Sequence, residues 1–535
     1  MARLFRSPGR VSARIAAVGV LALAAATLLP VQAASAVPAN ACANRANTTY
    51  SMLLECVTVE GVRGHQAELQ KIADASDDPI YPGTRAAGTE GYAASVDYVA
   101  GQLRRAGYQV TLDEFQFDFV FPAVLQQLGP LTATYETGAF TGSPSGNVSG
   151  RVVPVDINLT GDRASTSGCE AADFAGFTPG SIALIQRGTC TFAEKAVNAQ
   201  AAGATAVIVF NQGNDPTREA LIVGTLVPSP AEITIPVVGA SFDNGVALAL
   251  PGSTARVQVL PNETRTDVNV IAELPGRNAN NVVMAGAHLD SVTAGPGIND
   301  DGSGTAALLE TALRMAKVTP ENTVRFAWWG AEEEGLIGST AYVEGLSQAE
   351  RDRIALYMNY DMVGSPNYIF MAYDADQSTF EAPVAVPPGS TAIEDLYESY
   401  YTKLGVPYDD TAFSGRSDYQ AFIEAGIPSG GLFTGAEERK SAAQQAIWGG
   451  TAGAQFDPCY HQACDTVDNV DLHALDVNSD LIAFAMLTYA FSTESVNGVP
   501  GKRVPGPGLT LPTPAGPQGT FATGDGGAGP GPVGT

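Results

Sequence analysis

Apolar runs and amphipathic stretches alternate along residues 267–492. Three short apolar runs predict buried strands, at 282–285, 323–328 and 354–359. The stretch 303–317 repeats apolar residues on one helical face, and 472–491 is expected to form a final helix. This alternation predicts an α/β sheet with helices on both faces.

A different pattern occupies residues 128–262, where short β-type runs are separated by Gly, Ser and Asn. We expect strands at 152–157, 181–186, 206–211 and 235–239, and one helix at 192–203. The pattern predicts a small β-rich domain that folds around its own core.

The N-terminal part, 37–127, begins with a segment between Cys42 and Cys56 that a disulfide would tie into a cap. Helices are expected at 61–74 and 91–106, the second ending at Gly107, a suitable C-terminal cap. The run 108–119 alternates like a strand, and a change of phase near Asp113 predicts a bulge. At the other end, residues 496–535 are rich in Gly and Pro with few large apolar groups, which predicts a disordered tail after the main domain of 263–495.

The first 36 residues have the pattern of a secretory signal peptide. Arg3, Arg6, Arg10 and Arg14 precede an apolar run at 15–29, and Ala34-Ser35-Ala36 offers a small-residue cleavage site. The run is too short and wrongly flanked for a membrane anchor. The sequence therefore predicts a secreted, extracellular protein that is not held in a membrane.

Charge and cysteine content agree with export. The chain of 535 residues has 29 Lys and Arg against 56 Asp and Glu, a formal net charge of −27. Such a chain repels phosphate backbones and anionic membranes, which argues against nucleic acid as a partner. The six cysteines fall into three local couples, Cys42 with Cys56, Cys169 with Cys190 and Cys459 with Cys464. Proximity favours these disulfides among the 15 connectivities that six cysteines allow, and no CxxC pair suggests a zinc finger.

Residues capable of binding metal follow the predicted strands. His288 follows the first strand, Glu332 and Glu333 the second and Asp361 the third, while Asp300 precedes the 303–317 helix. Because ligands gather at the carboxyl ends of strands in open α/β sheets, one rim could hold them all. Nitrogen and carboxylate ligands suit zinc, and a bridging carboxylate suits a zinc pair about 3.5–4 Å apart.

A fifth ligand must come from the remaining histidines. His461 is favoured, because it lies in the short loop between Cys459 and Cys464. His65 and His473 are expected to be solvated surface residues.

Each motif also has a purely structural explanation. A triple Glu more often marks an exposed helix face. His288 and Asp290 could form a structural pair, and Asn299-Asp-Asp-Gly302 could be a turn with a helix cap. Their joint order and their placement after apolar strands favour the metal site.

These residues resemble the co-catalytic zinc aminopeptidases of family M28, most closely the secreted double-zinc enzymes of Streptomyces. The resemblance covers about 267–492 and rests on Gly286-Ala-His-Leu-Asp-Ser291, Gly297-Ile-Asn-Asp-Asp-Gly-Ser-Gly304, Trp329-Gly-Ala-Glu-Glu333, Asn359-Tyr-Asp-Met362 and Asp457-Pro-Cys-Tyr-His461. It implies a mixed-sheet zinc exopeptidase fold. It also implies one zinc held by His288 and Asp361, another held by Glu333 and His461, and Asp300 as the bridge.

The same resemblance assigns further roles. Glu332 would be the general base, Asp290 would orient His288, and Tyr460 would hydrogen-bond the developing oxyanion. Gly415 and Arg416, in Ser414-Gly-Arg-Ser-Asp418, resemble the part of the pocket that receives the substrate's amino end. Met362 and Phe433 resemble the wall of the apolar side-chain pocket.

Two matches are weaker. Asp476 and Asp480 resemble calcium ligands of the secreted relatives, although helix-surface aspartates explain them equally well. Glu334 stands where close relatives have an apolar residue, so a one-residue register error in the glutamate assignment stays open.

Residues 128–262 resemble a protease-associated domain. The resemblance rests on Gly180-Ser-Ile-Ala-Leu-Ile-Gln-Arg-Gly-Thr-Cys190, Phe192-Ala-Glu-Lys195 and Ala201-Ala-Gly-Ala-Thr-Ala-Val-Ile208. Chain order makes it an insertion in the peptidase domain, where it would frame or restrict access to the active site.

The resulting expectation is a secreted, monomeric aminopeptidase with two zinc ions and a preference for large apolar N-terminal residues such as Leu. Three alternatives stay open: a carboxypeptidase or dipeptidase of the same metal architecture, a non-catalytic peptide-binding protein, and a single-zinc glutaminyl cyclase. The complete ligand set argues against the last two.

Overall fold

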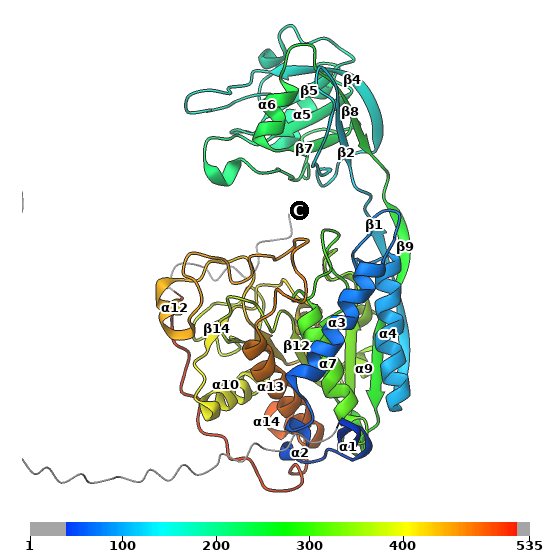
Figure 1. The fold of residues 1–535 in the computed structure, drawn as a ribbon, viewed down its shortest axis with the longest axis vertical. Coiled ribbons are helices and arrows are strands. Elements are labelled where there is room, and N and C mark those ends of the chain that lie inside the picture. Colours follow the sequence, from blue (N-terminus) through cyan, green and yellow to red (C-terminus); the bar gives the residue numbers. More distant parts are fainter. Residues whose placement is uncertain (1–38, 522–535) are drawn as a thin grey trace, which may run out of the picture. The chain divides into compact units, whose positions relative to one another are not determined.

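The computed structural model describes residues 39–521, so the expected signal peptide at 1–36 lies outside the described residues. Two sheets organise this part of the chain (Figure 1). The larger consists, in spatial order, of β1 (Gln109–Phe119), β9 (Glu263–Leu274), β11 (Asn322–Trp329), β10 (Asn278–His288), β12 (Ile354–Tyr360), β15 (Ser429–Phe433), β13 (Met371–Tyr373) and β14 (Asp409–Thr411). The smaller consists of β3 (Ala133–Tyr135), β2 (Val124–Gly129), β8 (Thr254–Val259), β4 (Gly146–Val155), β5 (Ile182–Gln186), β6 (Ala206–Phe210) and β7 (Val237–Ala240).

The larger sheet is mixed, with β11, β10, β12 and β15 parallel at its centre. One face packs against α3 (Val59–Ala75), α4 (Glu90–Ala106), α7 (Gly302–Met315), α10 (Ser390–Leu404) and α13 (Leu472–Phe491). The other face packs against α8 (Ile337–Gly345) and α11 (Tyr419–Glu424). The expected α/β architecture with helices on both faces is confirmed.

The remaining helices are short or belong to the smaller domain. They are α1 (Ala39–Asn44), α2 (Tyr50–Leu54), α5 (Phe192–Ala201), α6 (Phe242–Leu248), α9 (Gln348–Arg351), α12 (Ala442–Trp448) and α14 (Glu494–Asn497). No described helix is long and apolar enough to cross a membrane.

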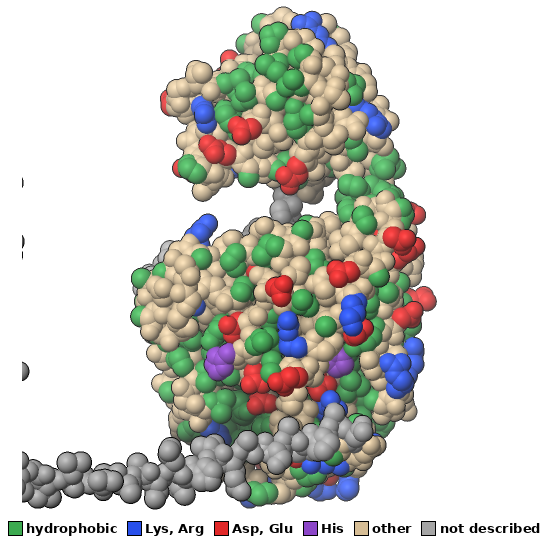
Figure 2. All heavy atoms as spheres, in the orientation of Figure 1, with side chains coloured by type: hydrophobic (Ala, Val, Ile, Leu, Met, Phe, Trp, Pro, Cys, Tyr) green, Lys and Arg blue, Asp and Glu red, His purple; other side chains and the backbone are tan. Residues whose placement is uncertain are grey.

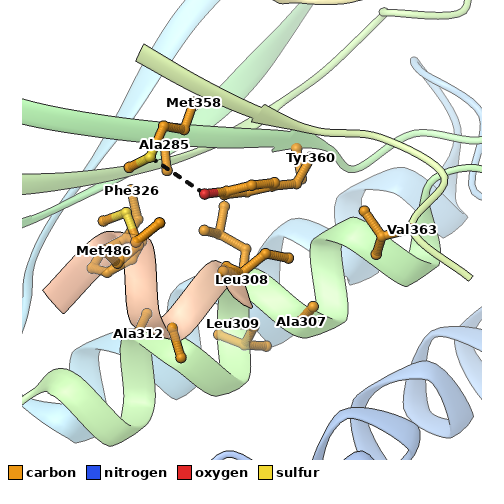
Figure 3. Packing of buried hydrophobic residues seen from close by; sticks show 14 of the residues in the cluster. Ala285, Ala307, Leu308, Leu309, Ala312, Phe326, Met358, Tyr360, Val363 and Met486 are labelled. Atoms are coloured by element: carbon orange, nitrogen blue, oxygen red, sulfur yellow. Dashed lines mark hydrogen bonds between the residues drawn. The ribbon is translucent and has the colours of Figure 1, made fainter. Parts of the chain in front are cut away.

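Successive side chains of the central strands point to opposite faces of the larger sheet, and one apolar core lies on each face. Met284 and Ala327 face α8 and α11, while their neighbours Ala285 and Phe326 face α7 and α13. Figure 3 shows the second core, where Leu308 of α7 and Met486 of α13 meet side chains from the strands. Burying one such Leu side chain contributes about 1.5–3 kcal/mol, so this packing fixes α7 against the sheet.

The smaller domain is an insertion between two paired strands. β1 and β9 pair antiparallel from Gln109↔Glu273 to Phe119↔Glu263, and the smaller sheet lies between them in sequence. Its first strand, β2, begins at Val124, before the boundary expected at 128.

The bulge expected near Asp113 is wrong, because the β1–β9 register is continuous. Residues 109–114 are half-buried or exposed, and only Phe115, Phe117 and Phe119 alternate strictly with exposed neighbours. The alternation of apolar and polar residues therefore changes phase in the part of the strand where neither face is buried.

The tail prediction is wrong for residues 499–521. This segment has no regular structure, but Val504, Leu509 and Leu511 pack on the core of the larger domain. The backbone N–H groups of Gly519 and Thr520 donate to Asp409 at 3.1 and 3.0 Å. Few apolar residues suffice here because they cover a core that the rest of the chain has already built.

The six cysteines form the bridges expected from their proximity: Cys42–Cys56, Cys169–Cys190 and Cys459–Cys464. Disulfides of this kind fit an extracellular protein. Acidic side chains lie at several places on the face drawn in Figure 2, together with Lys and Arg side chains.

Candidate active site

The ends of three parallel strands place the candidate ligands on one rim. β10 lies between β11 and β12, with His288 opposite Trp329 and Gly286 opposite Asn359. His288 is the last residue of β10, and Asp361 follows the last residue of β12 directly. Glu332 and Glu333 follow β11 in a turn, so the exposed helix face that a triple Glu suggests is not formed.

Asp300 stands between the two histidines. Its Oδ1 lies 3.1 Å from Nε2 of His288, and its Oδ2 lies 3.3 Å from Nε2 of His461. His288 Nε2 is also 3.7 Å from Asp361 Oδ1, and His461 Nε2 is 3.0 Å from Glu333 Oε2. The five expected ligands are thus brought together in two groups that share Asp300.

Glu332 and Glu333 face different parts of this cluster. A Glu332 oxygen lies within 4.8 Å of donor atoms of His288 and Asp361, and a Glu333 oxygen lies within 4.8 Å of donor atoms of His288 and Asp300. Glu333 also contacts His461, whereas no ion pair or hydrogen bond joins the Glu332 carboxylate to a histidine among the described residues. The two glutamates therefore have different surroundings.

Three residues next to the cluster adopt left-handed backbone conformations although none is glycine. Their φ angles are 52° at Ala331, 54° at Met362 and 56° at His461. Such conformations cost about 1–3 kcal/mol each and concentrate at functional sites, where packing enforces them. They set the direction of Glu332, Asp361 and His461.

Asp290 supports both the histidine and the glutamates. Its backbone carbonyl lies 3.1 Å from His288 Nδ1 and its Oδ1 lies 3.6 Å from the same nitrogen, and the carboxylate accepts hydrogen bonds from the backbone N–H groups of Glu332 at 3.2 Å and Glu333 at 3.3 Å. It is fully buried. Sequence analysis anticipated the contact with His288 but not the contacts with the glutamate turn.

A chain of hydrogen bonds holds Asp361. Ser417 donates to Asp361 Oδ2 at 2.6 Å, and Asn359 donates to Ser417 at 2.7 Å. Tyr357 donates to Asn359 at 3.0 Å, and Trp329 donates to Tyr357 at 2.8 Å. Because every member comes from β11, β12 or the 414–418 loop, the sheet itself aims this carboxylate.

Two aspartates fix the loop that carries Asp300. Asp301 caps α7 by accepting from Gly304 at 2.8 Å, and it also accepts from the backbone of His288 at 3.1 Å and of Met362 at 3.1 Å. Asp465 accepts from the backbone N–H of Asp300 at 3.0 Å. The helix-cap explanation of this motif is thus correct for Asp301, while Asp300 remains free to face the histidines.

Arg85 is a supporting residue that sequence analysis missed. It is fully buried, and its guanidinium donates to the carbonyls of Leu289, Pro296 and Gly297. The fork of Arg85 therefore holds the 289–297 loop between His288 and Asp300. A lone Arg in the turn-rich segment before 91–106 carries no sequence signal of this partner.

Burial and crowding shift the acidities of the cluster. Burial alone lowers the pKa of His288, but Glu332, Asp290, Asp300 and Asp361 outweigh it and raise that pKa well above its usual value. Burial, with Asp361, Asp418 and Glu333 nearby, raises the pKa of Glu332 well above its usual range despite the opposing effect of His288. So many carboxylates around two imidazoles leave a cluster that attracts cations.

A second group of residues lies beside the cluster. Arg416 donates to Glu437 Oε1 at 3.1 Å and to the Tyr460 hydroxyl at 3.2 Å, and the Tyr460 ring stacks on His461 with centroids 3.8 Å apart. Met362 and Phe433 belong to one small apolar cluster, against which Tyr460 also packs. The structure thus brings together the residues that the sequence proposed for the substrate pocket.

The other candidate residues lie apart from this cluster. His473 is exposed, as expected, but His65 is buried and the expectation for it is wrong. Its Nδ1 lies 2.7 Å from the Tyr98 hydroxyl and its Nε2 lies 3.3 Å from Glu310. Asp476 and Asp480 lie on α13, where burial raises the pKa of Asp480 to about 7 with help from Asp476.

The donor set passes a simple test for zinc. Two imidazoles and three carboxylates are the ligand types that zinc prefers in hydrolases. Glu333 Oε1 is buried and has no hydrogen-bond partner, although every buried carboxylate oxygen needs one or a cation. The mixed sheet and this donor set are those of a metal-dependent hydrolase.

Comparison with known proteins gives the family. The model of peptidase family M28 matches residues 269–486, and the PA domain model matches residues 148–248. The chain is 47% identical over 455 residues to an aminopeptidase of Pseudomonas aeruginosa, covering 83% of each chain. It is 41% identical to a probable leucine aminopeptidase 2 of Aspergillus fumigatus, over 77% of this chain and 80% of that one.

Solved structures agree. BSAP, a zinc aminopeptidase from Bacillus subtilis, matches with a TM-score of 0.61 and 26% identity over 80% of this chain and 94% of that one. An aminopeptidase from Aneurinibacillus sp. strain AM-1 matches with a TM-score of 0.55 and 28% identity over 86% and 98%. The chain belongs to peptidase family M28 and carries an inserted PA domain; it is a hydrolase of the aminopeptidase type.

Proposed function

We propose that the protein is an exported two-zinc aminopeptidase that removes large apolar residues such as Leu from peptide N-termini. The observation that carries this proposal is the placement of Asp300, whose two oxygens face two different histidines at 3.1 and 3.3 Å. A carboxylate used in this way is suited to bridge two cations about 3.5–4 Å apart.

His288 and Asp361 would hold one zinc, and Glu333 and His461 the other. When bound, such a pair supplies Lewis-acid polarisation of the scissile carbonyl and increases the acidity of water. Asp290 and the Ser417–Asn359–Tyr357 chain orient the ligands from outside, as metal sites generally require.

Glu332 acts as the general base. It is buried beside the cluster without a histidine partner of its own, so its carboxylate is available to take a proton from the attacking water. The same carboxyl then delivers the proton to the leaving amine. Tyr460 lies against His461, where its hydroxyl can donate to the oxyanion that develops on the substrate.

Arg416, Gly415, Met362 and Phe433 are proposed to bind the N-terminal end of a peptide. Arg416 is held by Glu437 and Tyr460, which supports a role for the 414–418 loop, with the Gly415 carbonyl, in receiving the substrate's amino group. Met362 and Phe433 offer an apolar wall for the first side chain. Several relatives are named leucine aminopeptidase, which supports the same preference.

Export and a structural calcium ion complete the proposal. Three disulfides fit an oxidising compartment, in agreement with the signal-like N-terminus. Asp476 and Asp480 are proposed as calcium ligands on α13, and the enzyme is proposed to act as a monomer.

The test is hydrolysis of leucine anilide beside its N-acetylated form, after chelation and again after zinc is restored. We expect zinc-dependent cleavage of the free-amine substrate alone. Cleavage of the blocked form would instead indicate an endopeptidase or a carboxypeptidase. No cleavage of either with zinc bound would favour a cyclase or a binding protein.

Replacing the base tests the mechanism separately. Glu332→Gln keeps the shape of the side chain but accepts no proton, so kcat should fall by about 100- to 10,000-fold while zinc content is unchanged. Glu334→Gln, the exposed neighbour, is the matched control and should retain activity. An active Glu332→Gln enzyme together with an inactive, zinc-poor Glu333→Gln enzyme would refute the base assignment alone.

A further inference from the structure

Five carboxylates gather at the β13–β14 edge of the larger sheet and take no part in the site described above. Asp374 and Asp376 follow β13, Glu394 and Glu398 lie on α10, and Asp410 belongs to β14. All are buried except Asp376, which is exposed.

Their oxygens converge. One oxygen each of Asp374, Asp376 and Glu394 lie within 4.8 Å of one another, as do one oxygen each of Glu394, Glu398 and Asp410. Glu394 belongs to both groups and so joins them. None of the ion pairs in the described part of the chain includes any of the five, so no Lys, Arg or His within 4 Å offsets their charge.

Asp410 gives a second and independent indication of a ligand. Its side chain is fully buried, and its Oδ2 accepts hydrogen bonds from the hydroxyls of Ser378 and Thr379. Its Oδ1 is buried and has no hydrogen-bond partner. An unpaired buried oxygen is destabilising, and more so when it is charged, so a partner is expected at this point.

The other carboxylates are already oriented. Asp374 accepts backbone hydrogen bonds from Ser378 at 2.9 Å, Thr379 at 2.9 Å and Phe380 at 2.6 Å. Glu394 Oε2 accepts from the backbone N–H groups of Ala375 and Asp376 at 3.1 and 3.0 Å. The bonds to Asp374 fix the loop after β13, and those to Glu394 tie this loop to α10.

We propose that these five carboxylates form a second metal site, which binds a calcium ion. The donors are all oxygen, without nitrogen or sulfur, which favours a hard cation over zinc. They come from a loop, a helix and a strand, an irregular arrangement that suits the six to eight flexible oxygen contacts of Ca²⁺ better than the strict octahedron of Mg²⁺.

The acidities agree with this assignment. Burial raises the pKa of Glu394 to about 9, with Asp376 and Glu398 adding to the effect, and burial raises the pKa of Glu398 to about 7. Without a cation these groups therefore take up protons at neutral pH, and a bound cation displaces them.

The ion would tie together elements at the edge of the sheet. It would join α10, β14 and the loop after β13, and Asp409 beside Asp410 already anchors the 519–520 backbone. Its role is structural, and it goes beyond the zinc chemistry and the calcium ligands proposed on α13.

The experiment uses the zinc-loaded full chain and calcium chloride alone as the probe. Binding is followed by calorimetry and by thermal unfolding at fixed zinc, up to about 10 mM calcium, because extracellular calcium modules bind at about 0.1–1 mM. Glu394→Gln with Glu398→Gln removes two ligand charges while preserving side-chain shape. Glu381→Gln changes an exposed carboxylate of the same region, and Asp476→Asn with Asp480→Asn removes the α13 candidates.

We expect wild type and Glu381→Gln to bind calcium with the same Kd and to gain the same rise in Tm. The Glu394/Glu398 variant should bind at least about tenfold more weakly, because two of the five proposed ligands lose their charge. The α13 variant should keep this binding event, and wild type at pH 7 should release at least one proton for each ion bound.

Three results would overturn the proposal. Wild type could show no saturable calcium binding, or the α13 variant alone could abolish it. The Glu394/Glu398 variant could also bind as tightly as wild type, which would leave the carboxylates as a network of shared protons. If that variant does not fold, calcium binding by Asp410→Asn and proton release by wild type are measured instead. Calcium binding by Asp410→Asn as tight as that of wild type, or calcium binding by wild type without proton release, would then overturn the proposal.

Discussion

The structure makes a quantitative prediction for Asp290→Asn. Asp290 is fully buried, accepts the backbone N–H groups of Glu332 and Glu333, and lies 3.6 Å from Nδ1 of His288. Asparagine has the same shape but only one acceptor oxygen. One of the two glutamate N–H groups then faces an amide NH₂, and the turn that directs the base and a ligand loses a charge-assisted hydrogen bond.

The size of the effect follows from that bond. A hydrogen bond to a charged group contributes about 1.5–3 kcal/mol, and about 1.4 kcal/mol corresponds to a factor of ten. We therefore expect kcat/KM to fall about 10- to 150-fold. Zinc affinity should fall by about 10- to 100-fold, the usual effect of removing a partner that orients a metal ligand.

The assay is leucine anilide hydrolysis with zinc content measured on the same samples. The matched control is Asp78→Asn, another buried carboxylate that accepts backbone N–H groups, from Ile80 and Tyr81 at 2.9 Å each. It should lower the free energy of unfolding without changing kcat/KM of the folded enzyme. Asp290→Asn with turnover and zinc affinity within about twofold of wild type would contradict the role assigned to Asp290, since the lost bond is worth tenfold or more.

Two further predictions concern other buried groups. Ser417→Ala removes the hydrogen-bond donor to Asp361, so zinc affinity measured by competition with a chelator should fall about 10- to 100-fold. The fold should be unchanged by circular dichroism. An unchanged zinc affinity would mean that the hydrogen-bond chain through Ser417 does not orient Asp361. Lys195 is buried in the PA domain, where burial lowers its pKa to about 8. The unfolded chain binds this proton more tightly, so the free energy of unfolding of wild type relative to Lys195→Met should rise by up to about 3 kcal/mol between pH 8 and 10.5. Urea titrations measure this difference. A difference in the free energy of unfolding that does not change with pH would contradict the lowered pKa of Lys195.

The candidate site could be predicted from the sequence because the proposed ligands follow apolar strands. His288 and Asp361 stand at strand ends and Glu333 lies in the turn after β11, and the parallel pairing of these strands brings their ends together. His461 was harder, since only its disulfide loop and the shortage of histidines selected it.

The residues that sequence analysis misjudged depend on partners far along the chain. His65 lies in a polar helix, and its burial depends on Tyr98, 33 positions away, and on Glu310 of α7, 245 positions away. Arg85 likewise meets carbonyls more than 200 positions away. Local pattern carries no trace of such contacts, and the tail was misjudged for the same reason.

The pairing of β1 with β9 has a consequence for how the chain can change. Phe119 is opposite Glu263 and Val124 is opposite Gln258, so the chain segments that enter and leave the inserted domain are paired on both sides of a short stretch without strand pairing. To the peptidase sheet, the whole insertion is therefore equivalent to a hairpin turn, and the closure entropy of a long loop does not arise once the insertion has folded. Such a module can be lost, exchanged or lengthened in evolution, or excised by an engineer with a tight turn, while every strand of the catalytic sheet keeps its neighbours.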